Sequence, residues 1–108
     1  MDFNAYQNAA RETALYADAY RVTYPALGLA SEAGEVAGKV KKVLRDRAGD
    51  FSEEQIGAIK DELGDVLWYV AVLAADLGLE MDAIAAGNIE KLRSRLQRGA
   101  IRGDGDKR

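Results

Sequence analysis

The fold of this 108-residue chain depends most on residues 52–78, which read SEEQIGAIKDELGDVLWYVAVLAADLG. Ser52 and Gln55 have the spacing of a capping box, which marks the start of a helix. Gly78 stands where a helix would end in a left-handed cap. The stretch therefore predicts one helix from after Ser52 to about Leu77. Its core stripe, at helical spacing, consists of Ile56, Ile59, Leu63, Val66, Val70, Leu73 and Leu77.

Helical patterns also dominate the rest of the chain, and no alternating strand pattern is convincing. We expect further helices over about residues 4–20, 25–45 and 81–96. The sequence thus predicts an all-α fold, with a helical domain over residues 1–98 and an irregular basic tail over 99–108. The apolar residues of the last helix, expected to face inward, are Ile84, Ala85, Ile89, Leu92 and Leu96.

The long third helix has a second apolar side, which carries Trp68 and Val72. A helix that is apolar nearly all round is buried nearly all round, and a chain this short has little to cover it with. We therefore expect a homodimer or a larger assembly. The alternative is that the first helix alone covers the second side. Gly34, Gly38 and Gly64 are expected to allow close approach between helices.

Composition limits the possible chemistry. The chain contains no cysteine and no histidine, which excludes thiolate zinc sites, cysteine nucleophiles and histidine bases. The net charge is −3, and residues 1–92 are acidic whereas residues 93–108 are basic. An acidic body argues against duplex nucleic acid as the main partner. On charge alone, the basic end is a solvated terminus.

Membrane and secretory segments are not apparent. The longest apolar run, from Val66 to Leu79, is interrupted by Asp76 and is too short to span a bilayer. The first residues are polar where a secretory signal needs an apolar stretch. We expect a cytoplasmic protein that does not act at a membrane.

Two pairs of acidic residues lie at the edges of core stripes on successive helices. Glu32 and Glu35 are three residues apart, and so are Glu62 and Asp65, so each pair shares a helix face. Two helices joined by a short loop pack antiparallel, which allows the pairs to converge. Converging carboxylates repel unless a cation lies among them, and oxygen ligands suit Mg²⁺, Mn²⁺ or Ca²⁺. The alternative is a solvated face, on which Glu35 pairs with Lys39.

The last helix carries a polar row within its apolar pattern. Asn88 lies between Ile84 and Leu92 at four-residue spacing, and Lys91 and Arg95 follow on the adjoining side. An amide, an amine and a guanidinium in one row can bind phosphate oxygens beside a metal. The alternative is an ordinary polar helix edge, with Asn88 bonded to nearby backbone.

Several stretches together resemble the MazG-like nucleoside triphosphate pyrophosphohydrolases. They are LGLASEAGEVAGKVKK at 27–42, DELGDVLWYV at 61–70, NIEKLRSR at 88–95 and GDGDKR at 103–108. AYQNAARETALY at 5–16 is similar to the first helix of that family, so the resemblance covers nearly the whole chain. The family pattern is Glu-x-x-Glu, a spacer, then Glu-x-x-Asp. The ordered combination is much more specific than either acidic pair alone.

The resemblance implies an all-α fold assembled as a dimer or a dimer of dimers. It also implies Mg²⁺-dependent cleavage of a nucleoside triphosphate to a monophosphate and pyrophosphate. The matching metal ligands are Glu32, Glu35, Glu62 and Asp65, and Asn88, Lys91 and Arg95 match positions near the nucleotide phosphates. Ser31 stands where some members place a further acidic residue.

The mechanism expected from these residues is metal-assisted hydrolysis, with a water on the metal or on Glu32 or Glu35 attacking the α phosphorus. Lys39 is a candidate for offsetting phosphate charge, and Tyr69 for lining the nucleotide pocket. Two other classes remain open: a non-catalytic nucleotide-sensing or partner-binding bundle with a cation site, and a structural oligomer with solvated acids. The tail is expected to order over the nucleotide as a lid, with Arg102 or Lys107 near the phosphates or a neighbouring subunit.

Overall fold

The computed structural model describes all 108 residues and contains helices but no strand, which confirms the all-α prediction. None of the helices combines the length and apolar character needed to cross a bilayer. The elements are α1 (Phe3–Arg11), a 3₁₀ turn η1 (Asp18–Tyr20), α2 (Thr23–Arg47), α3 (Glu53–Asp76) and α4 (Met81–Gln97). Residues beyond α4 form turns and bends.

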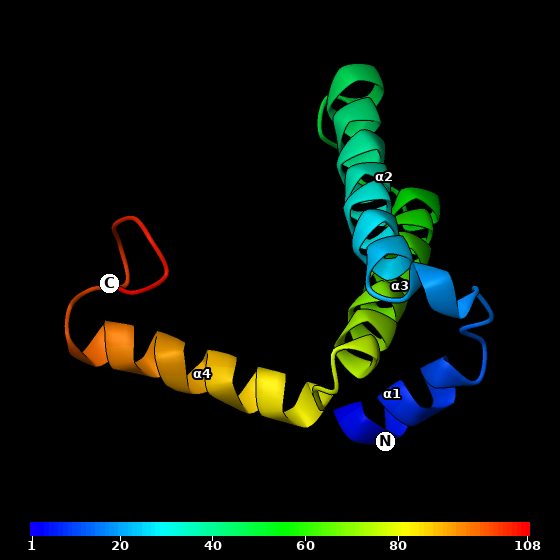
Figure 1. Cartoon of the computed structure of the whole chain (residues 1–108). Helices are drawn as coiled ribbons and strands as arrows, with labels where there is room; N and C mark the ends of the chain where they lie inside the picture. The colour runs from blue at the N-terminus through cyan, green and yellow to red at the C-terminus, as the bar shows by residue number, and fades with distance from the viewer.

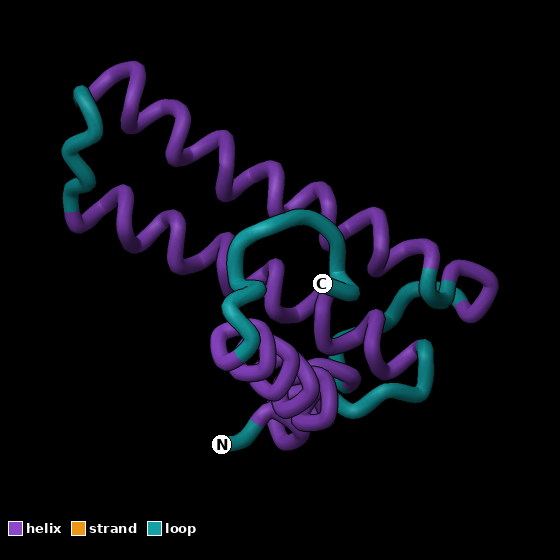
Figure 2. Tube along the Cα trace, turned by 90° about the vertical axis from the view of Figure 1, so that its left-hand side faces the viewer, coloured by secondary structure: helices purple, strands orange, loops and turns teal.

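The two longest helices, α2 and α3, form an antiparallel hairpin and lie side by side (Figure 2). The start of α3 is capped as predicted. The Ser52 hydroxyl accepts from the Gln55 backbone N–H at 3.3 Å, and the Gln55 amide oxygen accepts from the Ser52 N–H at 3.0 Å. Gly78 follows α3 with φ 72°, as predicted for a left-handed cap. This hairpin is the frame on which the acidic pairs are placed.

The first helix is shorter than predicted, because α1 ends at Arg11 rather than near residue 20. Contacts with α3 account for the difference. The Trp68 indole N–H donates to the Thr13 hydroxyl at 2.8 Å, and the Tyr16 hydroxyl donates to the Asp76 carboxylate at 2.7 Å. These tertiary contacts hold residues 12–17 as an irregular connection that begins with a turn, despite a local pattern that favours helix.

The second apolar side of α3 is covered within the chain. Val72 is 1% exposed and belongs to a small core with Ala10 of α1, Ala71 and Met81. Helix α1 packs across α3 at this point, which was the alternative to a partner subunit (Figure 1). Trp68 is likewise a packing residue, bonded to Thr13 as described above.

The predicted core stripe of α3 is only partly covered, since four of its seven residues are half-buried and three are exposed. Ile56, Leu63 and Leu77 are each more than half exposed. The expected role of the helix glycines is wrong within the chain, since a Cβ at Gly34, at Gly38 or at Gly64 would meet nothing within 4 Å. One chain therefore leaves a row of large apolar side chains on the hairpin exposed.

Helix α4 points away from the hairpin and carries the tail at its far end (Figure 1). Its apolar residues were expected to face inward, and within one chain this is wrong. Ile84, Ile89, Leu92 and Leu96 are between 38% and 68% exposed. Only nine of the 108 residues are buried, so a single chain does not close a bundle around α4.

The entry to α2 is held by Asp76 of α3. Val22, which precedes α2, has φ 67°, a backbone conformation that is strained for a β-branched residue. Its N–H donates to the Asp76 carboxylate at 2.9 Å, beside the Tyr16 hydroxyl, and Arg21 lies 3.6 Å away. Burial acts to raise the pKa of Asp76. The donors from Val22, Tyr16 and Arg21 outweigh it and lower that pKa.

Asp76→Asn is expected to destabilise the protein by about 2 kcal/mol at pH 7, because a charged acceptor of several donors is lost. Since folding lowers the pKa of Asp76, its contribution is complete above the unfolded pKa of about 3.9 and is lost as the pH falls through the folded value. Urea unfolding of both proteins between pH 7 and pH 2, at one protein concentration, measures this. A difference that does not shrink in acid would contradict it.

Candidate metal and nucleotide site

Three carboxylates converge in the middle of the hairpin. Glu32 extends from α2, and Glu62 and Asp65 from α3, and one oxygen from each lies within 4.8 Å of the other two. Glu32 and Glu62 are half-buried and Asp65 is exposed. Glu35, one turn further along α2, is exposed and stands outside this group. The structure thus brings together three of the four acidic residues expected to converge.

The electrostatics of this cluster are those of carboxylates that repel one another. A hydrogen bond shared with Glu62 raises the pKa of Glu32. Partial burial and the negative charges of Glu62, Asp65 and Glu35 add to the rise. The Lys39 ammonium lies 3.6 Å from a Glu62 oxygen, so Lys39 pairs across the hairpin. The Glu35–Lys39 pair expected on a solvated face is not formed.

These residues fit a hard divalent cation. All the ligand atoms on offer are carboxylate oxygens, which suit Mg²⁺ or Mn²⁺. A cation among them would also relieve the repulsion that raises the pKa of Glu32. Because Asp65 is exposed, one side of such an ion would face solvent.

A row of aromatic rings adjoins the cluster. Tyr16 and Tyr24 stack with centroids 5.0 Å apart, and Tyr24 lies 6.3 Å from Tyr69. A hydrogen bond with Tyr24 raises the pKa of Tyr69, as do partial burial and the charges of Tyr24, Glu32 and Asp65. Tyr69 therefore lies beside the carboxylates, where the sequence placed it. The part played by Tyr24 was missed, because nothing in its spacing links the start of α2 to Tyr69.

Gly28 of α2 makes room for the Tyr69 ring, because a Cβ at this position would overlap the ring atoms. Gly28→Ala is therefore expected to displace Tyr69 and to cost about 1–3 kcal/mol of stability through overpacking. Gly34→Ala on the same helix is the matched control. A Cβ there meets nothing, and helix propensity predicts no loss or a gain of up to about 1 kcal/mol. Chemical denaturation compares the two, and equal stabilities would contradict the packing role of Gly28.

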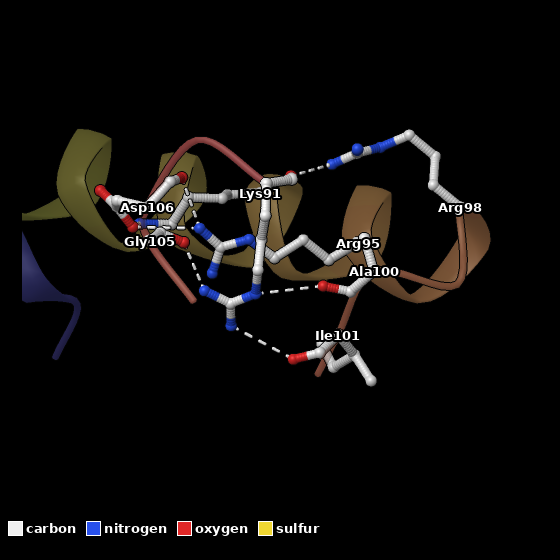
Figure 3. A network of polar contacts seen from close by, with 8 residues as sticks. Lys91, Arg95, Arg98, Ala100, Ile101, Gly105 and Asp106 are labelled. Atoms are coloured by element: carbon white, nitrogen blue, oxygen red, sulfur yellow. Dashed lines mark hydrogen bonds and ion pairs between the residues drawn. The ribbon is translucent and has the colours of Figure 1, made fainter. Parts of the chain in front are cut away.

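The polar row of α4 is not brought to the carboxylates within one chain, because α4 leaves the hairpin (Figure 1). Asn88 is exposed in one chain. Lys91 and Arg95 instead contact the tail, where both reach Asp106 (Figure 3). The sequence did not predict this contact, because the tail was expected to act through its basic residues Arg102 or Lys107.

Comparison with known proteins identifies the class to which this fold and carboxylate cluster belong. The family model for the MazG nucleotide pyrophosphohydrolase domain matches residues 24–99, so the chain belongs to that family. The chain is 44% identical to the Gene 37 protein of Mycobacterium phage L5, over the whole length of both proteins. No solved structure matches the chain.

Proposed function

We propose that this protein is a Mg²⁺-dependent nucleoside triphosphate pyrophosphohydrolase that yields a nucleoside monophosphate and pyrophosphate. The observation that carries the proposal is the meeting of Glu32, Glu62 and Asp65 across the α2–α3 hairpin of a MazG-family chain. Oxygen ligands in this number suit an ion that completes its shell with substrate phosphates. The family membership makes nucleotides the first substrates to test.

The acidic residues have two different roles in this proposal. Glu32, Glu62 and Asp65 hold Mg²⁺, with Mn²⁺ as a substitute. When bound, the ion supplies Lewis-acid polarisation of the phosphate oxygens and lowers the pKa of a water. Glu35 lies next to the cluster with an exposed carboxylate, which suits it to orient the attacking water and to accept its proton.

Basic and aromatic side chains around the cluster would receive the nucleotide. Lys39 already lies at the edge of the carboxylates. A cavity of about 250 Å³ beyond it is lined by the basic residues Lys39, Lys42 and Arg47 and by the acidic residues Asp46 and Glu54. We assign the end of this cavity nearest Lys39 to the leaving pyrophosphate, whose charge Lys39 and Lys42 would offset. Tyr69, on the other side of Glu32 and Asp65, would line the pocket for the nucleoside.

The site is proposed to be completed by a second copy of the chain, in a homodimer or a dimer of dimers. Two rows of large apolar side chains, on α3 and on α4, stay exposed in one chain. Pairing would bury them and would bring Asn88, Lys91 and Arg95 of one copy toward the carboxylates of the other. Free nucleoside triphosphates are cytoplasmic substrates, and we propose a cytoplasmic location on that ground.

A mixed nucleotide panel tests the proposal. Each common ribo- and deoxyribonucleoside triphosphate is incubated with the full chain in Mg²⁺ or in EDTA, and pyrophosphate is measured. Release with at least one nucleotide in Mg²⁺, and none in EDTA, is the expected result. Mg²⁺-dependent binding without turnover would instead favour a nucleotide-sensing module and would overturn the enzymatic proposal.

A further inference from the structure

The tail after α4 folds back on that helix and pairs with it through one carboxylate. Asp106 accepts from the Lys91 ammonium at 2.8 Å and from the Arg95 guanidinium at 3.1 Å (Figure 3). The same Arg95 nitrogen also donates to the Asp106 backbone carbonyl. Two cations four residues apart on a helix repel each other, and a carboxylate between them offsets that repulsion.

The turn that carries Asp106 is closed by polar contacts of its own. The Arg108 guanidinium donates to the carbonyls of Ala100 and Ile101, both at 3.2 Å, and to that of Gly105 (Figure 3). Arg98 at the end of α4 donates to the Arg108 carbonyl at 2.8 Å. The tail therefore forms a defined loop that returns Asp106 to α4.

The pair beneath this loop keeps capacity for a further anion. Arg95 is 5% exposed, and its Nε has no hydrogen-bond partner. The Lys91 side chain remains 39% exposed. Asp106 supplies one negative charge to this cluster, and Lys91 and Arg95 supply two positive charges, so one positive charge is left over. The exposed Lys91 thus stays open to phosphate oxygens, and the buried Arg95 adds its positive charge beside it, while Asp106 fixes their spacing.

We infer that Asp106 is a positioning residue, which holds Lys91 and Arg95 side by side for the substrate's phosphates. This inference rests on the proposed function, because it takes these cations as phosphate ligands. The Asp106 carboxylate and carbonyl hold the Arg95 guanidinium in one orientation, and ordering it in advance lowers the entropy cost of binding phosphate. Asp106 does not itself touch the reacting atoms.

The test measures the binding of inorganic tripolyphosphate in Mg²⁺ by calorimetry, beside steady-state kinetics with the best nucleotide. Asp106→Asn is expected to weaken tripolyphosphate binding and to raise KM, each by about fivefold to tenfold, with kcat within about twofold. Asp106→Glu should restore most of the loss. Asp104→Asn is the matched control, because Asp104 lies on the same loop and forms no ion pair.

Two further results make the outcome decisive. Arg108→Gln opens the loop without changing Lys91, Arg95 or Asp106, and it should weaken binding in the same direction. Unchanged binding in both Asp106→Asn and Arg108→Gln would overturn the inference. Tighter binding in Asp106→Asn would also overturn it, since the carboxylate would then compete with phosphate. If the wild-type protein binds tripolyphosphate but hydrolyses no nucleotide, the proposed activity fails, while the binding series still decides the role of Asp106.

Discussion

Glu62→Gln and Asp65→Asn are each expected to lower kcat about a thousandfold while leaving the helical fold intact. Each variant removes one of the three carboxylates that lie within 4.8 Å of one another. A bound ion contributes several kcal/mol of charge stabilisation, and about 4 kcal/mol corresponds to a thousandfold in rate. Steady-state hydrolysis in saturating Mg²⁺, with circular dichroism of each variant, measures the effect.

Stability provides an independent readout of the same carboxylates. Neutralising one member of a repelling cluster should leave the melting temperature in EDTA equal or higher. Mg²⁺ should raise the melting temperature of the wild-type protein and much less that of the two variants, because ligands that bind only the folded state stabilise it. Asp61→Asn, which alters an exposed carboxylate beside Glu62, is the control and should behave as wild type.

A variant of Glu35 distinguishes metal binding from water activation. Its carboxylate lies outside the three-residue cluster, so Glu35→Gln is expected to abolish turnover yet keep most of the Mg²⁺-induced rise in melting temperature. Variants of Glu62 and Asp65 that hydrolyse nucleotides normally would show that the catalytic assignment is wrong.

Ile89→Glu is expected to break the assembly and to abolish activity with it. Ile89 is 46% exposed in a single chain, so a charge there costs an isolated monomer little. In the proposed dimer the same side chain is buried against the second copy, and an unpaired buried charge costs several kcal/mol. Sedimentation equilibrium at low micromolar concentration should show an oligomer for the wild-type protein and a monomer or unfolded chain for the variant.

Ala83→Glu supplies the control for this experiment. Ala83 is also exposed on α4, but it lies on the face opposite the apolar row. The Ala83→Glu substitution should therefore leave the oligomer and its activity unchanged. A wild-type protein that sediments as a stable, folded monomer would contradict the assembly and the shared site together.

Local signals predicted the hairpin well because short-range chemistry determines its ends. Ser52 and Gln55 cap α3, Gly78 ends it, and i,i+3 spacing places Glu62 and Asp65 on one face. Local signals could not predict that α1 is short. Its end depends on hydrogen bonds to Trp68 and Asp76, which lie far along the chain and compete with a locally helical pattern.

The surroundings of the carboxylates were harder to predict for a similar reason. The fit of Gly28 against Tyr69 and the contact of Asp106 with Arg95 both join segments whose register no local pattern reveals. The prediction that the apolar face of α4 points inward was wrong within one chain for a different reason. The periodicity identified an apolar row correctly, but it cannot say whether that row is covered by the same chain.

Hydrolysis in ¹⁸O-labelled water tests the central claim most directly. The full chain is incubated with Mg²⁺ and the best nucleoside triphosphate, and the products are analysed by mass spectrometry. Attack of water on the α phosphorus predicts one labelled oxygen in the nucleoside monophosphate and none in the pyrophosphate. Label in pyrophosphate, release of orthophosphate as the primary product, or equal turnover in EDTA would contradict the account.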